Sequence, residues 1–199
     1  MDIKWISLLV ISILYFAALL ISGILALRYQ AKHKTFKKIS HELENNILQF
    51  KKSFEENFQE NNFIKSNYDL PKNEGLYLEI NNFSCYKTTV PKSKKEIFTD
   101  ENESEFKVTY LKENYTLKNN KFKVPDFFGK LYLTNLRILF QNSEGFFQLP
   151  LSQINGCIIT VLNINGFYKP GVIIKTATNY YRVVTDSTEI GFYINKLLN

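Results

Sequence analysis

The chain has 199 residues, with 25 Lys and Arg against 19 Asp and Glu and a net charge of +6. Five of the basic residues fall within residues 28–38, so the rest of the chain is almost neutral and a nucleic-acid-binding surface is not supported. Beyond residue 28 the chain is long enough for one domain of ordinary size plus a connecting segment.

The first segment is apolar. Between Lys4 and Arg28 lie 23 residues without a charge, from Trp5 to Leu27. At about 1.5 Å per residue they would form a helix of roughly 34 Å, which is enough to cross a hydrocarbon core of about 30 Å. A cleaved secretory signal is the alternative, but the run is too long for one and has no small-x-small cleavage pattern. We therefore predict a transmembrane anchor over residues 1–28.

The charges that flank this segment are unequal. Asp2 and Lys4 nearly cancel on one side, whereas a basic cluster follows on the other, consisting of Arg28, Lys32, Lys34, Lys37 and Lys38. Basic flanks stay in the cytoplasm. This predicts a single-pass protein of the cell membrane with residues 28–199 in the cytoplasm. The same juxtamembrane cluster could bind anionic headgroups, or it could serve only as the orientation signal.

Residues 29–70 contain a helical pattern. No Gly or Pro occurs from Arg28 to Asn62, and apolar residues recur at intervals of three or four. These residues, which we call the stripe, are Phe36, Ile39, Leu43, Ile47, Phe50, Phe54 and Phe58. The pattern predicts an amphipathic helical linker which, continuing the membrane helix, would make a stalk of roughly 50 Å.

The stripe needs a partner, because seven apolar side chains on one helical face are not stable in water. One hypothesis is self-association as a coiled coil, or docking of a protein partner, through residues 36–58. The other is that the stripe packs on the chain's own globular domain. The sequence leaves both open.

From Gly75 onward the pattern becomes that of β-structure. Short runs rich in Tyr, Phe, Ile, Val and Thr are separated by Gly, Pro and Asn. The predicted strands are Leu76–Ile80, Cys85–Val90, Glu105–Leu111, Lys130–Thr134, Arg137–Gln141, Phe146–Leu149, Cys157–Leu162, Val172–Thr176 and Tyr180–Thr185. Asn135 lies where a tight hairpin needs a residue that tolerates positive φ.

The last segment is predicted to be a helix. Asp186 followed by Glu189 resembles a capping box. The residues that form one helical face are Ile190, Tyr193, Ile194, Leu197 and Leu198. Such a helix would cover the open end of a curled sheet and complete its core.

Two consecutive stretches carry a family resemblance. Gly129-Lys-Leu-Tyr-Leu-Thr-Asn-Leu-Arg-Ile-Leu-Phe140, followed by Phe147-Gln-Leu-Pro-Leu-Ser-Gln-Ile154, resembles a hairpin of GRAM and bacterial pleckstrin-homology-like (PH-like) domains. The resemblance covers residues 129–198 well and 75–128 more loosely. It implies an α+β fold over 71–199, in which an antiparallel β-barrel or sandwich is capped by a C-terminal helix.

The physical interpretation of this motif is structural. Its alternating apolar residues, Leu131, Leu133, Ile138 and Phe140, are predicted to point inward. Thr134 and Asn135 supply turn chemistry, and Gly129 relieves crowding at the strand start. We expect Arg137 to pair with a nearby acid or carbonyl in preference to contacting a ligand.

The resemblance also suggests one candidate ligand site. Some PH domains bind inositol phosphates through basic loop residues, which implies a candidate anion- or lipid-binding cluster at Lys92, Lys94 and Lys95. The sequence itself favours a solvated loop there, since Glu96 lies beside the lysines and no Arg is present for bidentate phosphate capture.

No residue constellation for catalysis is evident. His33 and His41 are the only histidines, and both lie in the predicted linker among lysines. Cys85 and Cys157 lie in apolar stretches and are interpreted as reduced core residues in preference to a disulfide. We predict no enzymatic activity, no catalytic or metal site and no cofactor.

Two functions of different classes follow. The first is a membrane-tethered interaction module that presents its cytosolic PH-like domain to a protein or peptide partner. The alternative is a module that senses anionic lipid headgroups through its basic loops. We favour the first, because an anchored domain gains little localisation from weak lipid affinity and because PH-like scaffolds offer sheet edges or grooves to peptides.

Overall fold

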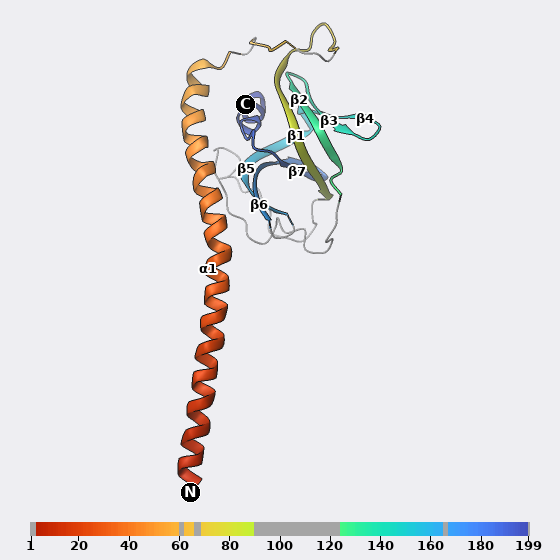
Figure 1. Cartoon of the computed structure of the whole chain (residues 1–199). Coiled ribbons are helices and arrows are strands. Elements are labelled where there is room, and N and C mark those ends of the chain that lie inside the picture. The colour runs from red at the N-terminus through yellow and green to blue at the C-terminus, as the bar shows by residue number, and fades with distance from the viewer. Residues whose placement is uncertain (1–2, 60–61, 66–68, 90–123, 165–166, 199) are drawn as a thin grey trace. The chain divides into compact units, whose positions relative to one another are not determined.

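The computed structural model describes residues 3–59, 62–65, 69–89, 124–164 and 167–198, and only the backbone of residues 3, 4, 32 and 33 (Figure 1). Its contacts divide the chain into two compact units, Met1–Lys38 and Ile39–Asn199. We call the second unit the head. The predicted strand Glu105–Leu111 and the cluster Lys92, Lys94 and Lys95 lie outside the described residues.

Helix α1 runs from Ile3 to Asn57. From Trp5 to Leu27 the apolar side chains of α1 are exposed, and Trp5, Leu20 and Leu27 are 66–68% exposed. By length and composition, this part of the helix is sufficient to cross a membrane. The helical prediction for this region is confirmed.

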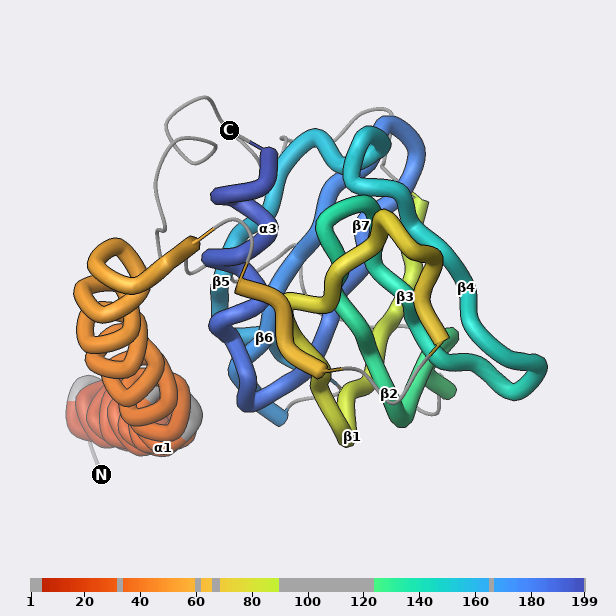
Figure 2. The backbone as a smooth tube through the Cα atoms, turned by 90° about the horizontal axis from the view of Figure 1, so that it is seen from above, coloured from red at the N-terminus to blue at the C-terminus, as the bar shows by residue number. Residues whose placement is uncertain are grey.

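The head contains one antiparallel sheet of seven strands. They are β1 (Leu76–Thr89), β2 (Phe127–Thr134), β3 (Arg137–Asn142), β4 (Gly145–Pro150), β5 (Ile154–Ile164), β6 (Phe167–Thr176) and β7 (Asn179–Val184). A 3₁₀ turn, η1 (Leu151–Gln153), precedes β5, and helix α3 (Ile190–Leu198) ends the chain. The strand order is β4-β3-β2-β1-β7-β6-β5, and Figure 2 shows the sheet curled around its interior. A curled antiparallel sheet followed by a C-terminal helix is the predicted α+β architecture.

Strand β1 corrects one prediction. The predicted runs that begin at Leu76 and at Cys85 belong to a single strand, which is continuous through Asn82 and described as far as Thr89. Asn82 has a φ of 63°, and the pairing with β2 shifts register between Asn81 and Phe83. Asn tolerates this left-handed conformation, so the polar residues that looked like a turn form a bulge within the strand. Because the strand bends there, its first part pairs with β2 and its last residues pair with β7.

The sheet is buried on both faces of the β2–β3 hairpin. Leu131, Leu133, Ile138 and Phe140 are all completely buried, as predicted from their alternation. The opposite face is also covered, a feature that alternation alone did not predict. A second cluster there consists of Leu76, Tyr132 and Leu139, against which Leu70 and Phe146 pack.

The hairpin turn fastens the segment before β1 to the sheet. Asn135 does not adopt the positive φ that we predicted, because Asn82 is the non-glycine residue with positive φ among those described. Instead its side-chain Oδ1 accepts the Gly75 N–H at 3.0 Å, and its own N–H donates to the Gly75 carbonyl at 3.1 Å. Thr134 Oγ1 accepts the Arg137 N–H at 3.0 Å, which confirms its turn role.

A buried ion pair completes this connection. The Glu74 side chain is 1% exposed and accepts from Arg137 Nε at 2.8 Å and Nη2 at 2.6 Å, as well as from the Thr134 hydroxyl at 2.6 Å. Arg137 Nη1 also donates to Gln148 Oε1 at 2.6 Å. The expectation that Arg137 pairs with an acid is therefore confirmed. The carboxylate is fully hydrogen-bonded, which is the condition for a buried charge to be tolerated.

Helix α3 begins later than the capping-box pattern predicts. At the corner before it, the hydroxyl that accepts a backbone N–H belongs to Thr185, which receives Ser187 N–H at 3.1 Å. Gly191 allows close approach to the sheet, since a Cβ there would come within 2.4 Å of the Ile159 side chain. On this face α3 completes the core, as predicted.

Both cysteines are buried, Cys85 in β1 and Cys157 in β5, and both are free thiols. Burial raises the pKa of the Cys157 thiol far above its usual range. The position of both residues in the core agrees with their interpretation as small apolar residues.

The buried ion pair yields a stability prediction. Glu74→Ala should destabilise the head by about 3 kcal/mol, because it leaves the Arg137 charge without its partner in a largely buried site. The matched control is Glu79→Ala, which breaks the exposed pair with Lys130 at 3.4 Å and should leave the unfolding midpoint unchanged. Chemical denaturation of the full chain in detergent measures both. Equal effects of the two substitutions would contradict the prediction.

Candidate binding site

The part of the stripe from Ile39 to Phe58 packs within the head. From Ile39 onward α1 belongs to the same compact unit as the sheet. Leu43, Ile47 and Phe54 are 4%, 5% and 8% exposed, and Phe50 and Phe58 are half-buried. Of the two hypotheses for the stripe, packing on the chain's own domain is therefore the arrangement present in the structure. Self-association through the same face would have to displace these contacts.

The partner of the stripe is α3. The Phe54 ring lies 5.8 Å from Phe192 and 4.9 Å from Tyr193, centroid to centroid, and the Phe50 ring lies 5.2 Å from Phe192. Phe58 stands 6.0 Å from both Tyr193 and Tyr77. Figure 2 shows α3 between the orange part of α1 and strand β5. Helix α3 is thus buried on two sides, whereas we predicted one apolar face.

This aromatic packing changes the environment of Tyr193. Burial, followed by the negative charge of Glu189, raises the pKa of the Tyr193 hydroxyl. At the other end of the cluster, Lys196 Nζ lies 6.0 Å from the centre of the Phe58 ring. Such a cation–aromatic contact is favourable. The contact between α1 and α3 therefore combines buried aromatic rings with the ammonium group of Lys196 at its margin.

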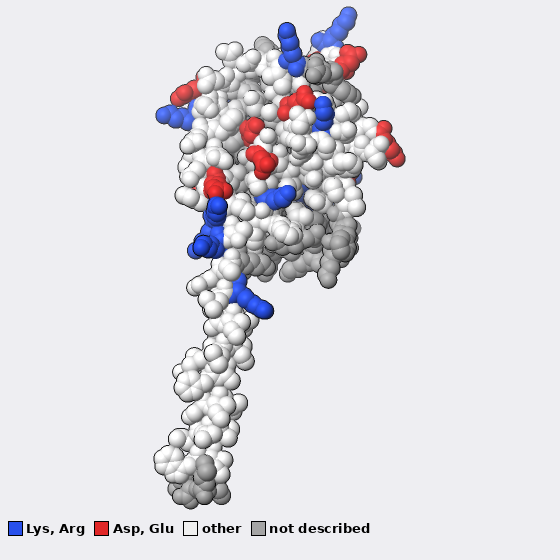
Figure 3. Space-filling model, in the orientation of Figure 1, with Lys and Arg blue, Asp and Glu red and all other residues white. Residues whose placement is uncertain are grey.

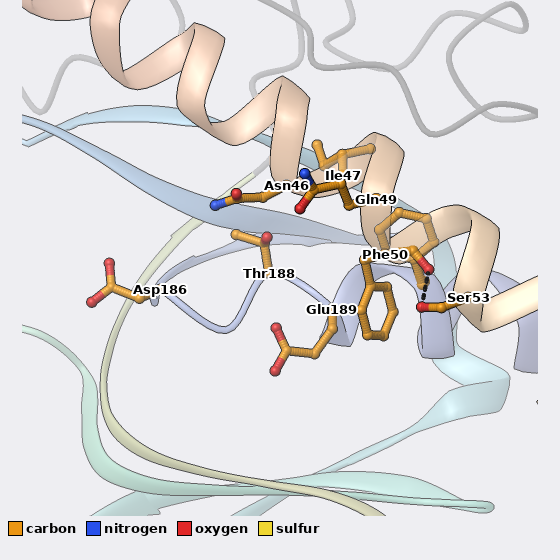
Figure 4. Close-up of a pocket in the computed structure, with 9 residues that line it drawn as sticks. Asn46, Ile47, Gln49, Phe50, Ser53, Asp186, Thr188 and Glu189 are labelled. Carbon is orange, nitrogen blue, oxygen red and sulfur yellow. Dashed lines mark hydrogen bonds between the residues drawn. The ribbon is translucent and has the colours of Figure 1, made fainter.

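Beside the aromatic contact there is a cleft of about 370 Å³. Its lining residues come from two segments, namely Asn46, Ile47, Gln49, Phe50 and Ser53 of α1, and Asp186, Thr188, Glu189 and Phe192 at the start of α3 (Figure 4). Ile47 and Phe192 are buried, whereas Asn46, Gln49 and Asp186 are exposed. The cleft therefore has an apolar floor and a polar rim.

The polar groups of the rim are mostly acceptors. Asp186 and Glu189 bring carboxylates, and Asn46 and Gln49 bring amides. The Ser53 hydroxyl is already used, since it donates to the Phe50 carbonyl at 3.0 Å. The lining contains no basic residue. The cleft is consequently suited to a group that donates hydrogen bonds and carries positive charge.

Sequence reasoning did not find this cleft. Asp186 and Glu189 were recognised only as a helix start, and nothing in the sequence connected them with Asn46 and Gln49, which lie about 140 residues earlier. The stripe at Ile47 and Phe50 was the one available signal, because it indicated that this part of α1 faces a partner. The identity of that partner is set by tertiary packing.

The predicted basic residues lie elsewhere. Lys92, Lys94 and Lys95 fall outside the described part of the chain, so their role stays a prediction. Arg28, Lys34, Lys37 and Lys38 are exposed on α1 within the first unit, where Lys32 also lies. On the face of the head shown in Figure 3, blue basic and red acidic side chains are interspersed.

Comparisons with known proteins give a limited result. No family model matches the chain, and no curated protein matches it. Among solved structures, the Vps36 N-terminal PH domain is similar, with 12% sequence identity and a TM-score of 0.36, covering 65% of this chain and 82% of that one. The architecture described above rests on the strand order and the terminal helix of this chain.

The aromatic contact yields a second stability prediction. Phe54→Ala should destabilise the head by about 3–4 kcal/mol, since it removes a buried ring that touches Phe50, Phe58, Phe192 and Tyr193. Leu48→Ala is the control on the same helix, because Leu48 is 62% exposed and its loss should change stability by less than about 0.5 kcal/mol. In a double-mutant cycle, Phe54→Ala and Phe192→Ala should couple by about 1 kcal/mol. Additive effects would show that the two rings do not interact.

Proposed function

We propose that this protein is a non-enzymatic, membrane-tethered interaction module. The apolar start of α1 anchors it in the cell membrane in a single pass, and its PH-like, GRAM-like head presents a binding surface to a protein or peptide partner in the cytoplasm. The observation that carries the proposal is that the two ends of α1 differ in the exposure of their apolar side chains. The helix begins with bare apolar side chains and ends with side chains buried in the head.

The anchor is supported by exposure as well as composition. Leu8, Ile11, Leu14 and Phe16 are 58–65% exposed, and a continuous apolar band of this kind is stable in lipid but not in water. The exposed basic residues that follow, including Arg28 and Lys34, support the inward orientation. They also supply charge for anionic headgroups at the membrane surface.

A protein partner is supported by the chemistry of the cleft beside α3. Its rim carries two carboxylates and no base, so it repels the phosphates of anionic headgroups. Its apolar floor and polar rim are typical of a small recognition site. Much of the stripe packs against α3, and we therefore place the partner surface at the cleft, where only Ile47 and Phe50 of the stripe take part.

Lipid-headgroup sensing is the second candidate. It depends on Lys92, Lys94 and Lys95, together with Lys87 near the end of β1. Lys87 Nζ lies 5.7 Å and 5.8 Å from the ring centres of Phe147 and Tyr181, so its ammonium group already packs on aromatic faces. This contact makes Lys87 less suited to bind a phosphate.

The two candidates are separated by a headgroup titration. The full chain, reconstituted in nanodiscs of neutral phosphatidylcholine, is titrated with inositol bisphosphate and with dioctanoyl phosphatidylserine. We expect no saturable binding below about millimolar concentration, and no difference between the wild type and Lys92→Ala/Lys94→Ala/Lys95→Ala, because Glu96 lies beside these lysines and no Arg is present there for bidentate phosphate capture. Retention of the chain in membranes after alkaline carbonate washing is the accompanying control for the anchor.

Saturable headgroup binding that disappears in the triple variant would overturn the protein-partner proposal in favour of lipid sensing. Release of the chain by carbonate would overturn the anchor. A binding signal that survives the triple variant but disappears when Arg28, Lys34, Lys37 and Lys38 are changed to Ala would assign headgroup binding to the juxtamembrane cluster instead.

A further inference from the structure

The cleft between α1 and α3 carries uncompensated negative charge. Asp186 and Glu189 are its ionisable groups, and within the described ranges neither forms an ion pair. The start of α3 contributes a positive partial charge of about half an elementary unit, which offsets only part of two carboxylates. The rim therefore remains net negative, and a cation is the complementary ligand.

One hydroxyl that makes no hydrogen bond within the described head lies at the cleft. Thr188 is only 6% exposed, and its side chain makes no hydrogen bond to any residue of the described head. Its backbone N–H is already bonded to the Asp186 carbonyl at 3.1 Å. Figure 4 shows the Thr188 side chain pointing toward α1, on the side where Asn46 and Gln49 project. The Thr188 oxygen is not one of the fully buried side-chain atoms that lack a hydrogen bond in the described head, so it remains accessible and this hydroxyl is available to a ligand.

The floor of the cleft is aromatic. The Phe50 ring and the Phe192 ring both line it and lie 5.2 Å apart. Aromatic faces attract cations, and a planar guanidinium group stacks on them especially well. A volume of about 370 Å³ lies near the lower limit for ligand pockets, which suits a single side chain.

We propose that this cleft binds an arginine side chain of the protein partner. The inference rests on the proposed function and gives the partner its chemistry. The guanidinium group would stack on the Phe50 ring, and its five N–H donors would meet the carboxylates of Asp186 and Glu189, the amide oxygens of Asn46 and Gln49 and the Thr188 hydroxyl. Lysine offers three donors and no plane, so it fits the same acceptors less well.

The test uses the full chain in neutral nanodiscs and three capped tripeptides, Gly-Arg-Gly, Gly-Lys-Gly and Gly-citrulline-Gly. Citrulline has nearly the shape of arginine but no charge. Saturation-transfer NMR of the peptides gives their dissociation constants. We expect millimolar binding of the arginine peptide, about two- to fivefold weaker binding of the lysine peptide and no measurable binding of the citrulline peptide.

Variants of the rim locate the binding. The double variant Asp186→Asn/Glu189→Gln should weaken binding of the arginine peptide about five- to tenfold. The matched control is Glu56→Gln/Glu144→Gln, which removes the same charge from exposed acids outside the cleft and should have no effect. Thr188→Val removes the hydroxyl while keeping the shape and should weaken binding about two- to fivefold. An unchanged near-ultraviolet circular dichroism spectrum shows that a variant keeps the head folded. If the double variant loses this spectrum, the binding constant of Thr188→Val alone tests the proposal.

Equal binding of the arginine and citrulline peptides, or equal weakening by the two charge variants, would overturn the proposal. So would binding of spermidine in the absence of arginine-peptide binding, because it would assign the cleft to a free polyamine. These failures leave the proposed function standing, since it requires only that headgroups are not bound and that the chain stays in the membrane. Conversely, headgroup binding lost with Lys92, Lys94 and Lys95 would overturn the proposed function whatever the peptides do.

Discussion

The packing of α1 on α3 through aromatic rings is the contact on which the rest of the head depends. Phe50 and Phe54 cover a face of α3 that would otherwise expose Phe192 and Tyr193 to water. Helix α3 in turn completes the interior of the sheet, where Gly191 lies against Ile159. The sheet, the terminal helix and the end of α1 thus form a layered core, so α1 from Ile39 onward is a structural part of the head.

Specific contacts also fix the segment that connects α1 to the sheet. Phe63 packs 5.1 Å from Tyr77, centroid to centroid, and Ile64 forms a β-bridge with Leu76. Glu74 is then bound by Arg137, and Gly75 by Asn135. The Thr-Asn-x-Arg motif of the β2–β3 hairpin therefore secures the entry into β1. Its residues are therefore used for structure.

Much of this architecture followed from sequence pattern, and the exceptions have physical reasons. Alternation placed Leu131, Leu133, Ile138 and Phe140 in the core, and three-four spacing placed the stripe on one helical face. The bulge at Asn82 was predicted as a break between two strands, because polar residues interrupt the apolar pattern in both cases. The cleft could not be predicted, since Asn46 and Asp186 meet only after the stripe has found α3.

A distance measurement within one chain tests the packing of α1 on α3 most directly. Spin labels are placed at Leu48→Cys and Lys196→Cys, both at exposed positions, while the buried Cys85 and Cys157 stay unlabelled. Double electron–electron resonance on the full chain should give a single narrow distance distribution that persists when labelled protein is diluted with an excess of unlabelled protein. A broad distribution, or one that disappears on dilution, would contradict the packing of α1 on its own α3 and would favour self-association through the stripe.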